Sequence, residues 1–183
     1  GKIVIDNKEV VMKDVRTADK HGIKLMHQEL NLCNDLRVYE NMFLGNERGK
    51  SYSLDWNETY GEADKYLKMV GLQESSRVLV KDIGTGKQQL VEIAKALSQN
   101  ARILIMDEPT ANLDTTAQKK VLDGIKNLSV QKGIKPTVIF ASNVPAEIAY
   151  ANRILLLENG QIVEDGNPKK LMTNPDSKVY QRL

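Results

Sequence analysis

Two acidic residues follow an apolar run near the middle of the chain, in the segment ILIMDEPTANLD at 103–114. The run predicts a buried strand whose carboxyl end, where open α/β sheets bind ligands, would carry Asp107 and Glu108. One carboxylate at this edge can hold Mg²⁺ directly or through water, and a second can orient or deprotonate an attacking water. Because many buried strands simply end in two solvated acids, this pair alone indicates the chemistry only weakly.

The elements predicted around this pair indicate an α/β protein. Apolar runs bounded by turn residues predict strands, and apolar residues at helical spacing predict helices. The predicted strands are 2–6, 8–12, 23–27, 102–106 and 137–141, and the predicted helices are 14–20, 38–45, one capped by Asn57, 87–99 and 114–132. Strands and helices alternate at both ends of the chain, whereas its middle is mostly helical. We therefore expect an α/β core at 1–28 and 101–183, with a helical subdomain inserted at 29–100.

Two further patterns complete the predicted elements. The runs 102–106 and 137–141 are continuously apolar, which is typical of strands in a sheet covered on both faces. The segment RILLLENGQIVEDG at 153–166 places an Asn-Gly pair, favoured in type I′ turns, between two apolar runs and therefore predicts a hairpin. One or two short helices are expected after Pro168.

Composition and charge exclude several classes of protein. The chain has 183 residues, of which 41% are hydrophobic and 27% charged, so a folded core is expected. The net charge of +2 is spread over both signs and indicates no nucleic-acid partner. Cys33 is the only cysteine, so it forms no internal disulfide, and we expect it to be a small buried side chain. Neither a membrane-spanning run nor a signal peptide is visible, which predicts a soluble, cytoplasmic protein.

Four segments together resemble the ATPase subunits of ABC transporters, and most of all the sugar-importer branch. They are MHQEL at 26–30, ENMFLG at 40–45, QQLVEIAKALSQNARILIMDEPTANLD at 88–114 and the late hairpin. The resemblance runs in the same order from residue 1 to about 166. It implies a P-loop NTPase core with a helical subdomain, ATP and Mg²⁺ as cofactors, a second nucleotide-binding domain and transmembrane permease subunits as partners, and a place on the inner face of the cell membrane. It also implies that the segment 29–56 lies near the permease.

The resemblance gives roles to residues around the acidic pair. Gln28 matches a glutamine that touches Mg²⁺ and the attacking water and senses the permease, although a merely exposed polar residue stays an alternative. Asp107 matches the metal-binding aspartate, and Glu108 matches the catalytic glutamate. Asp114 matches a residue that helps to couple two nucleotide sites across a dimer.

The segment IGTGKQQ at 83–89 aligns with the family signature L-S-G-G-Q, whose serine and glycine N–H groups meet the γ-phosphate held by the opposite subunit. Helix N-termini favour such anions. Gly84 replaces the serine and Lys87 replaces the glutamine, whereas Gly86 keeps its place. The predicted phosphate-binding residues are Gly84, Thr85, Gly86, Lys87 and Gln88. A plain start of a helix remains an alternative for this segment.

A second departure from the family follows the predicted strand 137–141. Family members carry a histidine after a serine at this point, and it contacts the γ-phosphate. Here the pair is Ser142-Asn143, and asparagine can donate or accept a hydrogen bond but cannot take up a proton near neutral pH. Asn143 is therefore the predicted catalytic residue at this position, where an asparagine replaces the family histidine.

The phosphate-binding loop G-x-x-x-x-G-K-[ST] occurs nowhere in the 183 residues. GTGK at 84–87 is followed by Gln88 and opens the signature helix, so it does not fit the pattern. In the family, this Walker A loop and its strand precede the position of Gly1. We therefore expect a partial core without them, which alone binds ATP weakly or not at all and does not hydrolyse it. An incomplete sheet would rearrange, self-associate through an exposed edge or be marginally stable.

Three interpretations follow, and whether this chain alone is an enzyme stays open among them. The first is the energy-coupling ATPase of an importer for a sugar or related small polar solute, present as a truncated chain. The second is a non-catalytic, degenerate or redesigned module that keeps the scaffold and a partner-binding surface, as Gly84 and Asn143 suggest. The third is another ABC class that acts in translation or repair, although such proteins more often carry basic surfaces.

Overall fold

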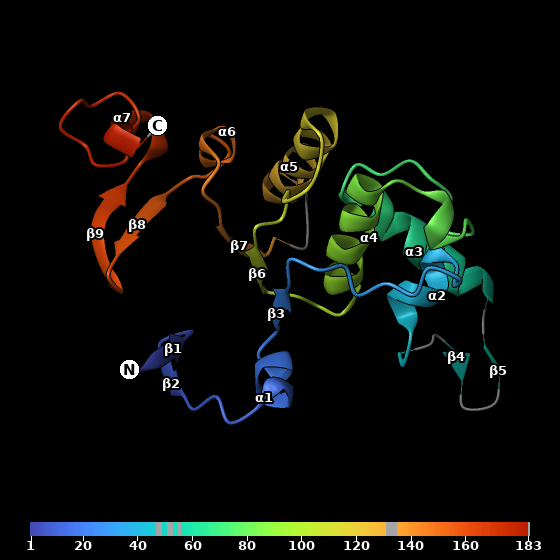
Figure 1. Cartoon of the computed structure of the whole chain (residues 1–183). Helices are drawn as coiled ribbons and strands as arrows, with labels where there is room; N and C mark the ends of the chain where they lie inside the picture. Colours follow the sequence, from blue (N-terminus) through green and yellow to red (C-terminus); the bar gives the residue numbers. More distant parts are fainter. Residues whose placement is uncertain (47–48, 51–52, 55, 131–134, 183) are drawn as a thin grey trace. The chain divides into compact units, whose positions relative to one another are not determined.

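The chain forms two compact units, Gly1–Ala141 and Ser142–Leu183, which are described separately below. The structure is a computed structural model, and it describes residues 1–46, 49–50, 53–54, 56–130 and 135–182 (Figure 1). The predicted division into a core and a helical subdomain at 29–100 stays a prediction.

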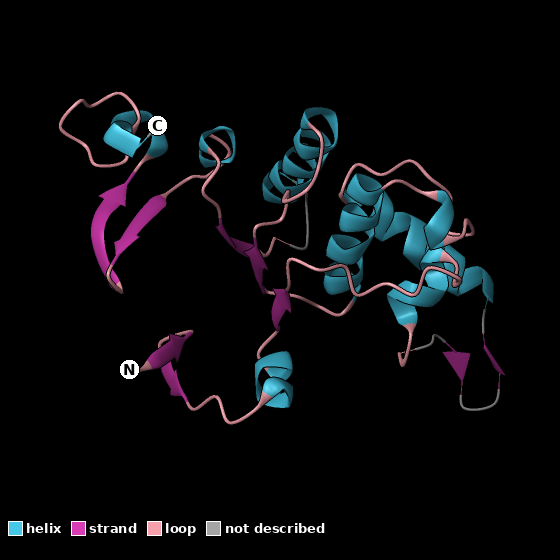
Figure 2. Ribbon diagram, in the orientation of Figure 1, coloured by secondary structure: helices cyan, strands magenta, loops and turns pink. Residues whose placement is uncertain are grey.

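A parallel three-stranded sheet is the centre of the first unit. Its strands are β3 (Ile23–Met26), β6 (Ile103–Asp107) and β7 (Thr137–Ala141), in the order β3-β6-β7 (Figure 2). Both pairings are parallel, with Met26 opposite Met106 and Asp107 opposite Ala141. All three carboxyl ends therefore lie at one edge of the sheet, as the α/β prediction requires.

The two faces of this sheet have different surroundings. Leu104 and Met106 are fully buried on one face, because successive side chains of a strand point to opposite sides. On the other strands, Leu25 is 56% exposed and Ile139 is 52% exposed. The expectation that both faces are covered is therefore wrong for 137–141, whereas Ile103 and Ile105 of 102–106 are half-buried on this face. An apolar run shows that a strand can be buried on both sides but not that a covering layer is present.

Four helices build the apolar core of the first unit together with the buried face of the sheet. They are α2 (Val38–Phe43), α3 (Trp56–Met69), α4 (Thr85–Ser98) and α5 (Thr115–Val130). In the last two helices, the apolar residues at helical spacing are buried: Leu90, Ile93, Ala94, Leu97, Val121, Leu122, Ile125 and Leu128. α4 begins two residues before the predicted start, and α3 begins at Trp56, so Asn57 lies in its first turn instead of capping it.

Smaller elements complete the first unit. The predicted strands 2–6 and 8–12 form a hairpin of β1 (Ile3–Ile5) and β2 (Lys8–Val10), turned by Asp6 and Asn7 with φ of 50° and 60°. α1 (Val15–Lys20) is capped by the Asp14 carboxylate, which accepts the Thr17 N–H at 2.7 Å. Three short elements of this unit were not predicted: β4 (Gly49–Lys50), β5 (Ser53–Leu54) and the 3-10 turn η1 (Val80–Asp82).

The second unit is a hairpin with short helical segments before and after it. Its elements are α6 (Pro145–Ile148), β8 (Ile154–Glu158), β9 (Gln161–Gly166), α7 (Pro168–Leu171) and the 3-10 turn η2 (Tyr180–Arg182). Asn159 and Gly160 turn the hairpin with φ of 50° and 76°, which confirms the predicted Asn-Gly turn. No helix in the described ranges is long and apolar enough to cross a membrane.

Candidate functional site

Gln28, Asp107 and Glu108 lie together at the carboxyl edge of the sheet. Because β3 and β6 run parallel with Met26 opposite Met106, the residues that follow each strand leave the sheet side by side. The Gln28 Nε2 donates a long hydrogen bond of 3.4 Å to Glu108 Oε2. The side chain of Asp107 is exposed at the same edge. Three residues predicted from two distant segments are thus brought into one place.

The backbone of Glu108 turns sharply where it leaves the sheet. Its φ is +43°, in the left-handed region that non-glycine residues seldom adopt. The Glu108 N–H donates to the carbonyl oxygen of Ala141 at 3.1 Å, and the Ala111 N–H donates to the Glu108 carbonyl oxygen at 3.0 Å. The end of β7 and the next turn therefore hold a conformation that would otherwise be unfavourable.

The oxygen donors at this edge suit Mg²⁺ in combination with a phosphate. Asp107 and Glu108 offer carboxylate oxygens and Gln28 offers an amide oxygen, all of which are hard ligands. Among the described residues, no group of three or more His, Cys, Asp or Glu side chains could hold a metal ion. The donor set fits Mg²⁺, which usually binds one or two carboxylates and completes its shell with water and substrate phosphate.

Two buried polar side chains hold the chain that follows Gln28. The Asn31 N–H donates to Glu92 Oε1 at 2.7 Å, and the Cys33 N–H donates to Asn41 Oδ1 at 2.7 Å. The Asn41 amide also donates to the Cys33 carbonyl oxygen at 3.0 Å. Cys33 itself is exposed, so the expectation of a buried thiol is wrong.

Burial raises the pKa of the Glu92 carboxyl, and the hydrogen bond from Asn31 partly opposes this effect. The side chain of Glu92 is only 8% exposed, although it carries an ionisable group. Neither Glu92 nor Asn41 was predicted as a functional residue. The available signal was a carboxylate in the otherwise apolar run LVEIA at 90–94.

Some residues of the signature segment are exposed, and others contact neighbouring groups of the protein. Gly84 caps the start of α4, and both Gly84 and Thr85 are exposed. Lys87 forms an ion pair with Glu74, which lowers the pKa of the Glu74 carboxyl. The Gln88 Nε2 donates to two backbone carbonyl oxygens of the preceding turn, at 3.0 Å and 2.9 Å. The Gln88 side chain thus stabilises the turn before α4. Its predicted contact with phosphate stays a prediction.

Gly86 brings α4 close to α5. A Cβ atom at this position would lie 2.8 Å from the Cβ of Ala117, closer than side chains approach one another. Gly86 therefore has a packing role in addition to the phosphate contact predicted for it.

Asp114 and the signature segment line one groove of about 670 Å³ between the starts of α4 and α5. The Asp114 Oδ1 caps α5 by accepting the N–H groups of Thr116 at 2.9 Å and Ala117 at 3.0 Å. Lys87 and Lys120 also line the groove. The structure thus brings Asp114 together with the signature residues, from segments that are about thirty residues apart.

Asn143 belongs to the second unit, and its side chain is exposed. The preceding Ser142 Oγ accepts the Val144 N–H at 2.9 Å, which fixes the turn after β7. The predicted part of Asn143 in catalysis stays a prediction.

Comparison with known proteins identifies a family and several relatives for this chain. The family model described as ABC transporter matches residues 1–111. The chain is 41% identical to the xylose import ATP-binding protein XylG of Moorella thermoacetica, covering 96% of this chain and 34% of that protein. It is 40% identical to the L-arabinose transport ATP-binding protein AraG of Geobacillus stearothermophilus, covering 90% and 32%. The chain thus spans about a third of the length of the curated relatives it matches.

Solved structures show the same fold. The dimeric post-hydrolysis structure of the ATP-binding cassette MJ0796 bound to ADP and Pi is 26% identical, with a TM-score of 0.69 over 92% of this chain and 73% of that chain. The ATP-binding cassette MJ1267 of an ABC transporter is 22% identical, with a TM-score of 0.77 over 99% and 76%, and shows the fold alone.

Proposed function

The chain belongs to the ABC transporter family, and from this premise we propose that it provides ATP-hydrolysing energy coupling for an importer of a sugar or a related small polar solute. The observation that carries the proposal is the hydrogen bond between Gln28 and Glu108 beside the exposed Asp107. Two acidic residues at the end of one strand would be a weak signal alone. The contact of Glu108 with the amide of Gln28, which follows the neighbouring strand, supports a site in which each residue has its own role.

Each residue at this edge has a chemical task in the proposal. Glu108 orients a water and accepts its proton as it attacks the γ-phosphate, and Gln28 holds the carboxylate and the water in line. Asp107 would hold Mg²⁺, which neutralises charge on the phosphates when it is bound. Ala141 keeps the Glu108 backbone in its strained conformation, so the carboxylate points in one direction.

The proposed partners are permease subunits and a second nucleotide-binding domain. The shared groove of Asp114 and the signature segment supports the second partner, because one surface could then meet a nucleotide held by the opposite domain. The proposed location is the cytoplasmic face of the cell membrane, with the segment 29–56 beside the permease.

The test is ATP hydrolysis by the importer purified with its permease, with and without candidate solutes. Xylose, arabinose and ribose are the first choices, since the names of relatives include all three. We expect repeated turnover that one of these sugars stimulates. Turnover that no sugar changes would contradict the solute class, and an importer without any ATP hydrolysis would contradict the function.

For the 183-residue polypeptide alone, we propose weak ATP binding and no hydrolysis. Its sequence contains no G-x-x-x-x-G-K-[ST] segment, and the backbone cradle of such a loop supplies much of the binding energy for a triphosphate. The apolar residues Leu25 and Ile139 on the exposed sheet face support self-association of this polypeptide. Sedimentation velocity over a range of concentrations tests this, and a monomer at every concentration would contradict it.

A second candidate function is a non-catalytic module that keeps the fold and a partner-binding surface. Gly84 in place of the family serine, Asn143 in place of the histidine and the engaged amide of Gln88 favour it. The coding sequence before Gly1 separates the candidates. A G-x-x-x-x-G-K-[ST] segment within about 70 residues supports the ATPase, and a native start codon at residue 1 supports the module.

A further inference from the structure

The carboxylate of Glu92 connects the middle of α4 to the chain that leaves β3. Its Oε1 accepts the backbone N–H of Asn31 at 2.7 Å, although 61 residues separate the two in sequence. A buried charged acceptor makes a stronger hydrogen bond than a neutral one, and leaving the N–H unpaired would be costly. This contact is therefore an anchor for the segment that carries Gln28.

The segment 27–30 is short and is held at both ends. On one side, Met26 is buried and paired within the sheet. On the other side, Glu92 holds Asn31, and Asn41 holds the backbone of Cys33. Gln28 lies between these anchors with its side chain exposed and its amide on Glu108. A shift of the Asn31 backbone would therefore also move Gln28, which lies only three residues away.

We propose that Glu92 is a positioning residue that keeps the Gln28 amide in contact with Glu108. Because Glu92 belongs to α4, the position of Gln28 then depends on the position of this helix. The same helix begins with the signature segment and lines the groove with Asp114. A movement of α4 on meeting a nucleotide of an opposite domain would thus displace the Asn31 anchor and change the distance between Gln28 and Glu108. The role of Gln28 and Glu108 in this inference rests on the proposed function.

Opposing effects act on the charge of the Glu92 carboxyl. Burial raises the pKa of Glu92, and the hydrogen bond from Asn31, Lys95 and His27 lower it, in that order. The glutamine variant Glu92→Gln keeps an oxygen acceptor of the same reach without the charge. The methionine variant Glu92→Met keeps a similar volume and removes the acceptor. The two variants separate packing from hydrogen bonding.

The first test is amide hydrogen exchange in the 183-residue chain, which does not require ATP. In Glu92→Met we expect the Asn31 amide to exchange about tenfold faster or more, because a bond to a charged acceptor is lost. The Cys33 amide is the internal control, since Asn41 still holds it. Glu92→Gln should give an intermediate rate. Unchanged Asn31 exchange in Glu92→Met would overturn the anchor, and if that variant does not fold, unchanged exchange in Glu92→Gln would do so.

The second test is ATP hydrolysis by the purified importer. Glu92→Met should lower kcat about tenfold to a hundredfold with KM for ATP unchanged, because a misplaced Gln28 affects the reacting water and not the binding of nucleotide. Glu92→Gln should recover most of kcat. Lys68→Met, at an exposed position on α3, is the control and should keep both parameters.

The two tests fail in different ways. Faster Asn31 exchange with an unchanged kcat would overturn the positioning role, even though the anchor exists. An unsubstituted importer that hydrolyses no ATP would contradict the proposed function, and the exchange rates would still decide whether Glu92 holds the Gln28 segment.

Discussion

Gly84 and Gly86 stand two positions apart at the start of α4 and have opposite surroundings. Among the described residues, no atom lies within 4 Å of the position that a Cβ of Gly84 would take. A Cβ at Gly86 would meet the Cβ of Ala117 at 2.8 Å, and Ala117 is too short to move aside. At this point, the close approach of α4 and α5 depends on the absence of a side chain at Gly86.

We predict that Gly86→Ala lowers the free energy of unfolding by about 1–3 kcal/mol, because α4 and α5 must move apart. The matched control is Gly84→Ser, which places a hydroxyl at the N-cap and should leave stability unchanged or raise it by a few tenths of a kcal/mol. Urea denaturation followed by circular dichroism measures both. Equal stability of the two variants would show that the helices tolerate a side chain at Gly86.

Part of the site could be predicted from residue types alone. The apolar run before Asp107 and Glu108 predicted that both residues lie at the end of a strand, because a short continuous apolar run is consistent with a buried strand. The engaged amide of Gln88 could not be predicted, because the same group can donate to a ligand or to its own backbone. Glu92 was missed for a related reason: a carboxylate on a helix normally faces solvent, and only the fold shows the N–H that it meets.

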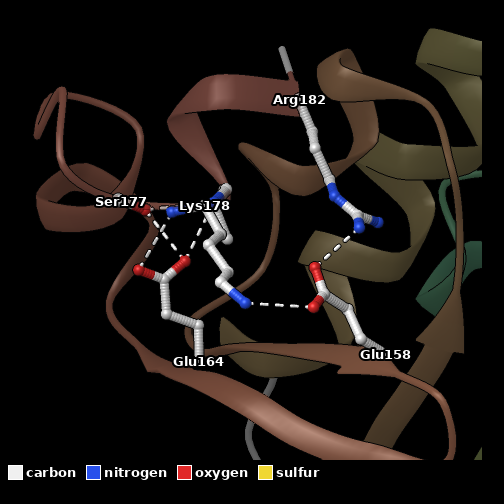
Figure 3. A network of polar contacts seen from close by, with 6 residues as sticks. Glu158, Glu164, Ser177, Lys178 and Arg182 are labelled. Carbon is white, nitrogen blue, oxygen red and sulfur yellow. Dashed lines mark hydrogen bonds and ion pairs between the residues drawn. The ribbon is translucent and has the colours of Figure 1, made fainter.

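The β8–β9 hairpin holds the end of the chain through two carboxylates (Figure 3). Glu164 accepts the N–H groups of Val179 at 2.8 Å and Lys178 at 3.2 Å, and the Ser177 hydroxyl donates to it at 3.0 Å. Glu158 pairs with the Lys178 Nζ at 3.0 Å and with Arg182 Nη2 at 2.6 Å. The segment 177–182 is thus attached to the hairpin mainly by the ionised form of these groups.

This attachment should depend on pH in a defined direction. The Val179 N–H bond, with those from Ser177 and Lys178, lowers the pKa of Glu164 below its ordinary value. A lowered pKa in the folded state gives stability above the ordinary glutamate pKa of about 4.3, and this stability is lost as pH falls through the lowered value. We predict that the Val179 amide is protected at pH 7 and loses protection in that acidic range.

Glu164→Gln should weaken the same protection at pH 7 and remove most of its pH dependence, as measured by hydrogen exchange. The control is Glu9→Gln, a carboxylate exposed on β2 in the first unit, which should leave Val179 unaffected. Equal protection of Val179 in Glu164→Gln and in the unsubstituted chain would contradict the attachment.

Turns and strands could be predicted from local sequence, whereas the burial of each sheet face could not. The Asn159-Gly160 turn was predictable because the turn type demands those residues, and β3, β6 and β7 were predictable from apolar runs. The cover on the second sheet face was predicted wrongly, since burial depends on what packs against a strand. The two-residue strands β4 and β5 are too short for any periodicity to show.

The chain combines the proposed catalytic edge of Gln28, Asp107 and Glu108 with a sequence that contains no G-x-x-x-x-G-K-[ST] segment. The carboxylates and the amide of the site can position a metal and a water, but they present no row of N–H groups to a triphosphate. The chain spans about a third of the length of each of these curated relatives. The family and the fold could both be predicted from the ABC transporter motifs, because the family match extends over residues 1–111.

We predict that calorimetric titration of the 183-residue polypeptide with Mg-ATP gives a Kd weaker than about 1 mM. A P-loop ATPase under the same buffer conditions is the positive control. Micromolar affinity would show that these residues alone cradle the phosphates and would contradict the weak-binding proposal.

The most direct test of the account is Glu108→Gln in the purified importer, with ATP binding and ATP hydrolysis measured on the same sample. Glutamine keeps the shape of the side chain and its contact with Gln28 but accepts a proton far less readily, so hydrolysis should be lost while ATP binding is kept. Glu9→Gln is again the matched control and should hydrolyse ATP at the unsubstituted rate. Unchanged hydrolysis in Glu108→Gln would contradict the claim that this carboxylate, set at the edge of the sheet beside Gln28, activates the attacking water.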